Sequence, residues 1–168
     1  MLEHQSMVFS IALRILNDRF LAEEAAQDVF LELYTKLHAP DAEGFSLTGF
    51  QSQDHIVHWL RRCTVHRSID RIRQRDRRAE VALETVTAND LPELAVEAPP
   101  GDPLLSRQLR QLVAALPATP RAVIALRYQE ERSPDEIAEL LSMPVATVKS
   151  HLRRTLRLLR EKLTRVLR

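Results

Sequence analysis

Two clusters of basic residues carry most of the binding chemistry that this sequence offers. Residues 61–78 contain eight arginines and two aspartates, and residues 149–168 contain eight lysines and arginines and one glutamate. Guanidinium and ammonium groups at this density attract anions, and nucleic acid is the usual anion at such surfaces. Helix surfaces that only face solvent also carry charge. Whether these clusters form nucleic-acid-binding surfaces or ordinary solvent-facing ones depends on where the basic residues lie on their helices.

Residue sets typical of enzymes are missing from the sequence. It has no glycine-rich phosphate loop, no Ser/His/Asp set and no compact carboxylate cluster. His55 and His58 have a spacing that could suggest a metal, but no cysteine or close pair of carboxylates supports them. We therefore expect a protein that is not an enzyme and that uses no metal and no cofactor.

Composition indicates an all-α protein. Of the 168 residues 45% are hydrophobic, but only 5% are aromatic and three are glycine, while Leu, Ala, Arg and Glu recur at helical spacing. Cys63 is the single cysteine, which excludes an internal disulfide and fits a reducing compartment. No apolar stretch approaches the roughly 18 residues of a membrane helix, and no signal peptide is recognisable. We expect a soluble, cytoplasmic protein without membrane insertion.

Charge also divides the chain into three parts. Residues 79–103 hold six acidic residues, four prolines and no Lys or Arg, a composition that disfavours a long helix. We interpret this segment as an acidic linker between two small helical domains. The expected boundaries are residues 1–78 for the first domain, 79–103 for the linker and 104–168 for the second domain.

The first basic cluster is predicted to lie on an amphipathic helix. Val65, Ile69 and Ile72 form an apolar stripe. At 100° per residue the opposite side carries Arg67, Arg71, Arg75 and Arg78. Leu60 and Cys63 lie off this stripe, so we expect the start of the helix to be buried on two sides. Because like charges at this density repel one another, we expect an anion to meet the basic side.

The second cluster lies on the second of two consecutive predicted helices. Ser133, Pro134 and Glu136 form a capping box that begins one helix, and Pro144 ends it and begins the next. The inner face of that next helix is predicted to be a seam of Val145, Val148, Leu152, Leu156, Leu159, Leu163 and Val166. Two helices joined this way, the second with a basic outer face, are typical of a helix-turn-helix whose second helix enters the major groove. An ordinary αα-hairpin is the alternative.

Two more helices are predicted upstream of this pair. One runs from Leu105 to Leu116, and the other follows a cap at Thr119 and Pro120 and continues through Tyr128. Together they predict a compact four-helix module. Lys149, Arg153 and Arg154 could neutralise phosphates or reach guanine N7 and O6, and Ser150 could bond a base edge or a phosphate; the sequence leaves open which residue does which.

These segments resemble the extracytoplasmic-function (ECF) group of bacterial sigma factors. "LPATPRAVIALRYQEERSPDEIAELLSMPVATVKSHLRRTLRLLREKL" is similar to their region 4. LuxR-type regulators carry a related "EIA…TVK.HL", but "ALRILNDRFLAEEAAQDVFLELYTKL" and "WLRRCTVHRSIDRIRQRDRR" also resemble regions 2.1 to 2.4, in the right order. The resemblance covers nearly the whole chain, and Ser142 stands where the family often has glycine.

The resemblance implies an RNA polymerase sigma factor that directs promoter-specific transcription initiation. Its expected partners are core RNA polymerase, through the β′ clamp helices and the β flap, promoter DNA, and an anti-sigma factor. The minus 35 element would be bound by Thr147, Lys149, Ser150, His151, Arg153, Arg154 and Arg157. The minus 10 element would be bound by Phe50, Arg61, Arg62, His66, Arg67, Arg71 and Arg75. Core polymerase would be bound by Glu24, Gln27, Asp28, Phe30 and Leu31, with Glu24, Gln27, Asp28 and Leu31 left free by the fold.

Two rival interpretations remain at this point. A LuxR-type helix-turn-helix regulator would usually carry a receiver or ligand-sensing domain with alternating strands and helices, and residues 1–78 show no such pattern. A helical interaction protein, such as an anti-sigma scaffold, would explain the helices but not two basic faces where a promoter would lie. Failure to bind nucleic acid even at low salt would favour the scaffold.

Overall fold

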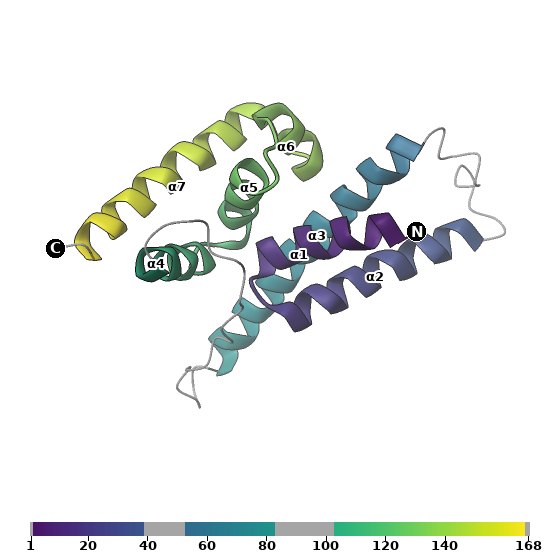
Figure 1. Ribbon diagram of the computed structural model, residues 1–168, viewed down its shortest axis with the longest axis horizontal. Helices are drawn as coiled ribbons and strands as arrows, with labels where there is room; N and C mark the ends of the chain where they lie inside the picture. Colours follow the sequence, from purple (N-terminus) through teal and green to yellow (C-terminus); the bar gives the residue numbers. More distant parts are fainter. Residues whose placement is uncertain (1, 39–52, 83–102, 167–168) are drawn as a thin grey trace. The chain divides into compact units, whose positions relative to one another are not determined.

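The computed structural model describes residues 2–38, 53–82 and 103–166. Within these ranges every element is an α-helix, and the all-α expectation is confirmed. The helices are α1 (Leu2–Leu16), α2 (Arg19–His38), α3 (Gln53–Ala82), α4 (Pro103–Ala114), α5 (Ala118–Tyr128), α6 (Pro134–Leu141) and α7 (Val145–Val166). The chain forms two compact units, residues 1–71 and 72–168 (Figure 1).

The first unit is built on an antiparallel pair, α1 and α2, that lie side by side (Figure 1). Only Asn17 and Asp18 connect them. Asn17 has a positive φ of 53°, which asparagine tolerates better than most residues, and its N–H donates to Leu13 O at 2.8 Å. The Asp18 carboxylate accepts from the N–H of Leu21 at 3.1 Å and so begins α2 as an N-cap.

The core of this unit joins all three of its helices. Val8 of α1, Val29 and Leu33 of α2, and Leu60 of α3 are buried together. Partly buried side chains surround them: Met7, Ala26, Phe30, Leu37, Ile56, Trp59 and Cys63. Burial of each large aliphatic side chain stabilises the fold by about 1.5–3 kcal/mol, and these contacts fix which side of α3 faces α2.

The predicted burial of α3 is confirmed. Val65, Ile69 and Ile72 are buried, as is Leu60 off the stripe. Between them lie two fully buried hydroxyl residues, and both bond within the helix: Thr64 Oγ1 donates to Leu60 O at 2.6 Å and Ser68 Oγ donates to Thr64 O at 2.8 Å. The two hydroxyl groups are therefore satisfied without any partner from another helix.

In the second unit, α7 packs against α4, α5 and α6. The start of α5 differs from the prediction. Its N-cap is Pro117, with no side-chain bond, and Thr119 and Pro120 lie inside the first turn. Instead, the buried Arg121 reaches back and donates to the carbonyl oxygens of Ala114 and Leu116, at 2.9 Å to Leu116. A guanidinium thus satisfies carbonyl groups at the end of α4, and its burial lowers the pKa of Arg121 to about 10.

The helix-turn-helix geometry follows the sequence closely. Ser133 Oγ accepts from the N–H of Glu136 at 3.2 Å, and the Glu136 carboxylate accepts from the N–H of Ser133 at 2.8 Å, so the capping box is confirmed. Ser142 ends α6 in the left-handed region, with φ 52° and ψ 46°. Its neighbour Met143 donates to Ala138 O at 3.0 Å, and Pro144 O accepts from Val148 N at 3.2 Å as α7 begins.

The predicted seam of α7 is wrong at one position. Val148 and Leu159 are buried, but Leu156 is exposed and Thr155 takes the inner place. At 100° per residue Thr155 lies closer than Leu156 to the line through Val148 and Leu159. Leu156 is apolar and directly follows Thr155, so its residue type alone suggested a place in the seam.

We expect Ser133→Ala to lower the free energy of unfolding by about 1 kcal/mol, because the backbone N–H of Glu136 loses its side-chain acceptor. Urea denaturation of the full chain measures this loss. Glu139→Ala, an exposed change on the same helix, serves as the control and should stay within about 0.5 kcal/mol of the wild type. Equal losses in both variants would contradict the capping role.

The capping carboxylate should also respond to pH. Hydrogen bonds from the Ser133 backbone, Arg132 and the Ser133 side chain lower the pKa of Glu136 from its usual 4.5 to about 2. A depressed carboxyl pKa contributes stability above the unfolded pKa and loses it as pH falls through the folded one. The stability difference between wild type and Glu136→Ala should therefore shrink between pH 4.5 and pH 2. Urea denaturation of both chains at a series of pH values measures this difference.

Candidate functional site

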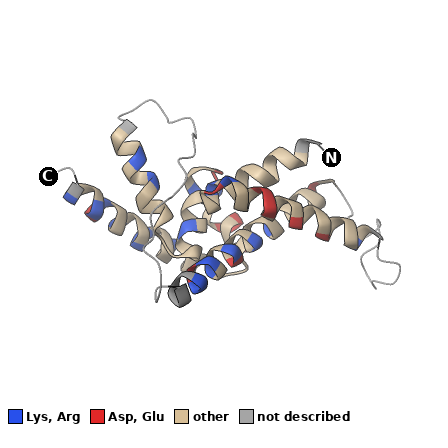
Figure 2. Cartoon of the chain, turned by 90° about the horizontal axis from the view of Figure 1, so that it is seen from below, with Lys and Arg blue, Asp and Glu red and all other residues tan. Residues whose placement is uncertain are grey.

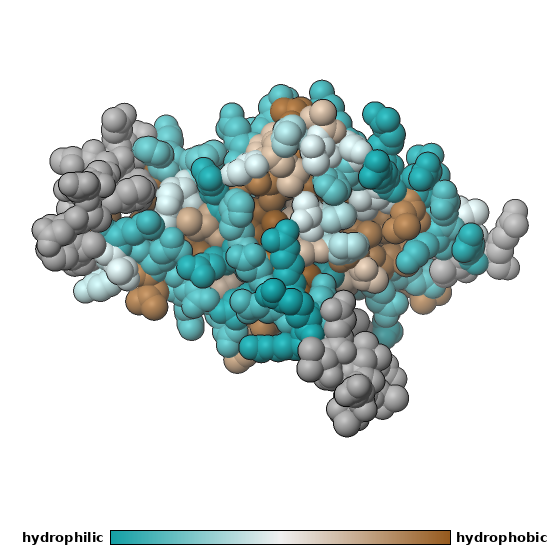
Figure 3. Space-filling model, turned by 180° about the vertical axis from the view of Figure 1, so that it is seen from behind, coloured by the Kyte–Doolittle hydropathy of each residue, from teal (hydrophilic) through white to brown (hydrophobic). Residues whose placement is uncertain are grey.

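The outer side of α2 carries an exposed apolar stripe. Phe20, Leu31 and Tyr34 are 68%, 64% and 60% exposed, and with the exposed Gln27 they share one side of the helix. Phe30, which was expected among the polymerase-binding residues, instead packs against the core of the first unit. Figure 3 shows exposed hydrophobic residues among mainly hydrophilic ones on one face of the protein. Exposed large apolar side chains in a row are typical of a docking surface.

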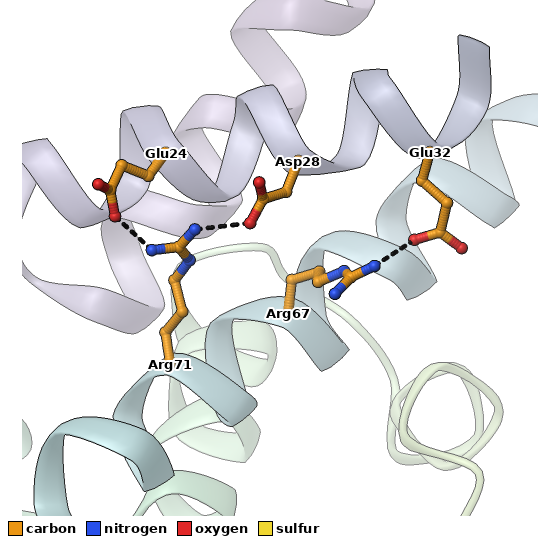
Figure 4. A network of polar contacts seen from close by, with 5 residues as sticks. All are labelled: Glu24, Asp28, Glu32, Arg67 and Arg71. Carbon is orange, nitrogen blue, oxygen red and sulfur yellow. Dashed lines mark hydrogen bonds and ion pairs between the residues drawn. The ribbon is translucent and has the colours of Figure 1, made fainter. Parts of the chain in front are cut away.

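A second side of α2 is joined to α3 by ion pairs. Glu24, Asp28 and Glu32 are spaced one turn apart and face two arginines of α3 that are also one turn apart (Figure 4). Arg67 Nη2 lies 2.8 Å from Glu32 Oε2. Arg71 bridges two carboxylates, with Nη1 on Glu24 Oε2 and Nη2 on Asp28 Oδ2 at 2.6 Å. We call these five residues the α2–α3 ladder.

The ladder corrects two expectations. Arg67 and Arg71 do not stand as an unpaired basic surface, because carboxylates of the same chain already meet them. Likewise, Glu24 and Asp28 are not free, since each gives one oxygen to Arg71. Gln27 and Leu31 remain exposed as expected. No local pattern indicates these pairs, because their members are 35 to 47 residues apart in the sequence.

Several other basic residues of α3 form fewer or longer ion pairs than Arg67 and Arg71. Arg62, Arg77 and Arg78 are exposed and have no ion pair within the described ranges. Arg75 is half-buried, and its Nε lies 3.8 Å from Asp76 Oδ1, a distance at which an exposed pair contributes little. Arg61 and His66 are half-buried and have other interactions. The positive charge available on α3 is therefore smaller than the sequence count.

A hollow between α2 and α3 brings several of the predicted residues together. It has a volume of about 580 Å³. Its lining residues are Glu32, Lys36, Trp59, Arg62, Cys63, His66, Arg67 and Asp70. Three of them were expected to bind the minus 10 element, while Lys36 and Trp59 were not. Trp59 packs against the core of the first unit and also lines this hollow. Phe50, also expected at the minus 10 element, lies outside the described residues.

Cys63 shows that the inner wall of this hollow is poorly solvated. Burial, and then the negative charge of Glu32, raise the pKa of the Cys63 thiol to about 11. A thiol of that pKa is almost entirely protonated near neutral pH and is a weak nucleophile. The side chain acts as part of the wall and not as a reactive group.

The outer face of α7 matches the prediction better. Lys149, Arg153, Arg154 and Arg157 are all exposed, and Thr147, Ser150 and His151 are half-buried beside them. Arg157 Nε lies 3.9 Å from Glu161 Oε1, whereas Lys149, Arg153 and Arg154 have no ion pair within the part of the chain that the structure describes. Figure 2 shows the basic bands along the helix that leads to the C-terminus.

The described residues contain neither a group suited to hold a metal ion nor a helix suited to span a membrane. No group of three or more His, Cys, Asp or Glu side chains is placed to hold a metal ion. Among these residues, none of the helices has the length and apolar character needed to cross a membrane.

Comparison with known families identifies the chain. A family model for sigma-70 region 2 matches residues 1–78, and one for sigma-70, region 4 matches residues 106–159. The chain belongs to the sigma-70 family of RNA polymerase sigma factors, in its extracytoplasmic-function (ECF) group. It is therefore a factor that recognises promoters together with RNA polymerase, and the matched region 2 disfavours the LuxR-type alternative.

Individual relatives agree with this assignment. The chain is 31% identical to the ECF RNA polymerase sigma factor SigW of Bacillus subtilis over 95% of this chain and 84% of the relative. It is 28% identical to SigK of Mycobacterium tuberculosis over 93% of this chain and 79% of the relative. The fold is similar to that of the sigma factor RpoE of Bartonella quintana, solved in complex with the anti-sigma factor NepR. The TM-score is 0.69 at 18% identity, covering 99% of this chain and 95% of that one.

We expect Cys63 to react with iodoacetamide at pH 8 at least about a hundredfold more slowly in the folded protein than in urea. The raised pKa leaves only about one thiolate in a thousand at that pH, against about a quarter for an ordinary cysteine. Mass spectrometry of the alkylated chain over time measures both rates. A folded-state rate near that of a free thiol would show that the wall of the hollow is open to water.

Proposed function

We propose that this sigma factor divides its work between its two helical parts. Residues 1–78 bind core polymerase and the minus 10 element, residues 104–168 bind the minus 35 element, and residues 79–103 tether them as an acidic linker suited to a basic channel. The observation that carries the proposal is the exposed basic face of α7, the second helix of a well-formed helix-turn-helix. On this face Lys149, Arg153 and Arg154 have no ion pair among the described residues. The protein would act in the bacterial cytoplasm as an initiation factor without catalysis of its own.

At the minus 35 element, α7 would enter the major groove. The N-terminal turns of a recognition helix contact base edges, while flanking residues bind phosphates. Lys149, Arg153 and Arg154 are exposed in the first three turns, where arginine can bond guanine O6 and N7. Thr147, Ser150, His151 and Arg157 complete the surface, and region 4 would also touch the β flap.

At the minus 10 element, the hollow of the first unit is the proposed site. Arg62 and His66 line it beside Trp59, and an aromatic ring with basic neighbours is suited to single-stranded DNA. Arg61, Arg75 and the residues near Phe50 are proposed as flanking contacts.

Core polymerase would dock on the outer side of α2. Gln27 and Leu31 are exposed there, and Glu24 and Asp28 each keep one carboxylate oxygen outside the ladder within the described residues. These groups form a helix face with an apolar centre and polar edges, the usual pattern for a helix that binds another helix. The β′ clamp helices are the proposed partner.

Run-off transcription with purified core polymerase tests the proposal as a whole. The wild-type chain should give promoter-dependent product and should bind core enzyme in a pull-down or fluorescence titration. If the folded chain neither binds core nor supports transcription from any promoter in a genomic library, the proposed function is rejected.

We expect Arg153→Gln to weaken holoenzyme binding to a promoter with its minus 35 element by about tenfold, because one base or phosphate contact is worth about 1–3 kcal/mol. Arg160→Gln removes the same charge from an exposed site two turns further along α7 and should have a smaller effect. Electrophoretic mobility shifts at constant salt compare the two variants. Losses of equal size would mean that the charge of α7 acts only as a general attraction.

We expect Leu31→Glu to weaken core binding by about tenfold or more, because a charge would replace the centre of an apolar docking face. Gln5→Glu adds the same charge to an exposed site on α1 and should bind core normally. Fluorescence titration with labelled sigma factor gives both dissociation constants. Unchanged core binding by Leu31→Glu would move the docking face elsewhere.

A further inference from the structure

The position of Arg71 conflicts with a role in DNA binding. Sequence alone places it on the basic side of α3, yet its guanidinium is bound by two carboxylates of α2 and its side chain is only 22% exposed. Arg67, by contrast, holds a single carboxylate and its side chain is 47% exposed. A phosphate would have to displace Glu24 and Asp28 from Arg71 or approach a group of three charges whose sum is negative. Both routes are unfavourable.

The same contacts place Arg71 beside the docking face of α2. Glu24 and Asp28 are like charges one turn apart, which repel each other on a helix surface. The Arg71 fork binds one oxygen of each and so relieves that repulsion while fixing both side chains, as Figure 4 shows. The other oxygens, Glu24 Oε1 and Asp28 Oδ1, are left to accept hydrogen bonds from outside the described chain.

We propose that Arg71 is a positioning residue of the polymerase-docking face and not a promoter contact. It holds Glu24 and Asp28 in the orientation in which their second oxygens meet a cationic partner group. Ordering a long side chain at an interface costs conformational entropy, and a side chain that is ordered beforehand avoids this cost. This inference rests on the proposed function, because it assumes that α2 docks on core polymerase.

A double-mutant cycle on core binding tests the inference. Arg71→Gln should weaken core binding by about five- to tenfold, since two carboxylates lose their orientation. In a Glu24→Gln, Asp28→Asn background the same change should have no further effect, because there is nothing left to orient. Arg71→Lys should also bind weakly, since one ammonium group cannot bridge both carboxylates as the guanidinium fork does.

Comparison variants separate positioning from charge and from folding. Arg19→Gln removes an arginine from an exposed ion pair with Glu23 on the same helix and should bind core normally. Arg62→Gln should weaken binding of the assembled holoenzyme to promoter DNA, whereas Arg71→Gln holoenzyme should bind that DNA like wild type. Thermal unfolding of each variant shows whether it still folds. Arg71→Lys keeps the positive charge and so separates the loss of the guanidinium fork from the loss of charge.

Several results would overturn the inference. Core binding by Arg71→Gln that is unchanged or tighter than wild type would show that Arg71 does not support docking. An effect that persists in the background without carboxylates, wild-type binding by Arg71→Lys, or promoter binding lost as in Arg62→Gln would do the same. Failure of the wild-type chain to bind core is a different outcome, and it rejects the proposed function itself.

Discussion

The packing of α3 against α2 is the constraint on which the first unit depends. Leu60 is buried with Val29 and Leu33, and this contact sets the rotation and register of α3 along α2. Once that register is set, carboxylates one turn apart on α2 meet arginines one turn apart on α3. The hollow lined by Trp59 lies along the same contact. Apolar packing therefore decides which charges pair and which remain available.

The two basic clusters, alike in the sequence, differ in the structure. On α7 the cationic groups from Lys149 to Arg154 point outward without ion pairs in the described chain, so their full charge is available to an anionic partner. On α3 part of the charge is neutralised by α2. Partial neutralisation has a physical advantage, because a long helix bearing many unpaired arginines would repel itself. It also means that net charge along a sequence overstates the field that DNA meets.

What could be predicted from the sequence was mostly local. The capping box at Ser133 and the break at Pro144 depend on residues within four positions of each other, and the periodicity of α3 identified its buried side correctly. Local rules failed where a neighbour in space decides. The expected Thr119 cap of α5 is absent because that helix already begins at Ala118, and Arg121 donates to the carbonyl oxygen of Leu116, a contact that the sequence pattern did not predict. Leu156 is a different case, because helical spacing itself places Thr155 nearer the line through Val148 and Leu159, and Thr155 is the buried residue.

The candidate sites divide in the same way. Exposure of the α7 residues follows from one amphipathic helix, so sequence sufficed to place them. The ladder and the hollow depend on the pairing of α2 with α3, and a single sequence carries no signal for contacts between residues 35 to 47 positions apart. Lys36 and Trp59 were missed at the hollow for this reason.

The connection between α1 and α2 has a consequence for how this chain can vary. Asn17 and Asp18 both have fixed structural roles, since Asn17 adopts a left-handed backbone conformation and Asp18 caps α2. An inserted or deleted residue there would therefore shift one of the two helices relative to the core. Changes in chain length among relatives should therefore spare this junction.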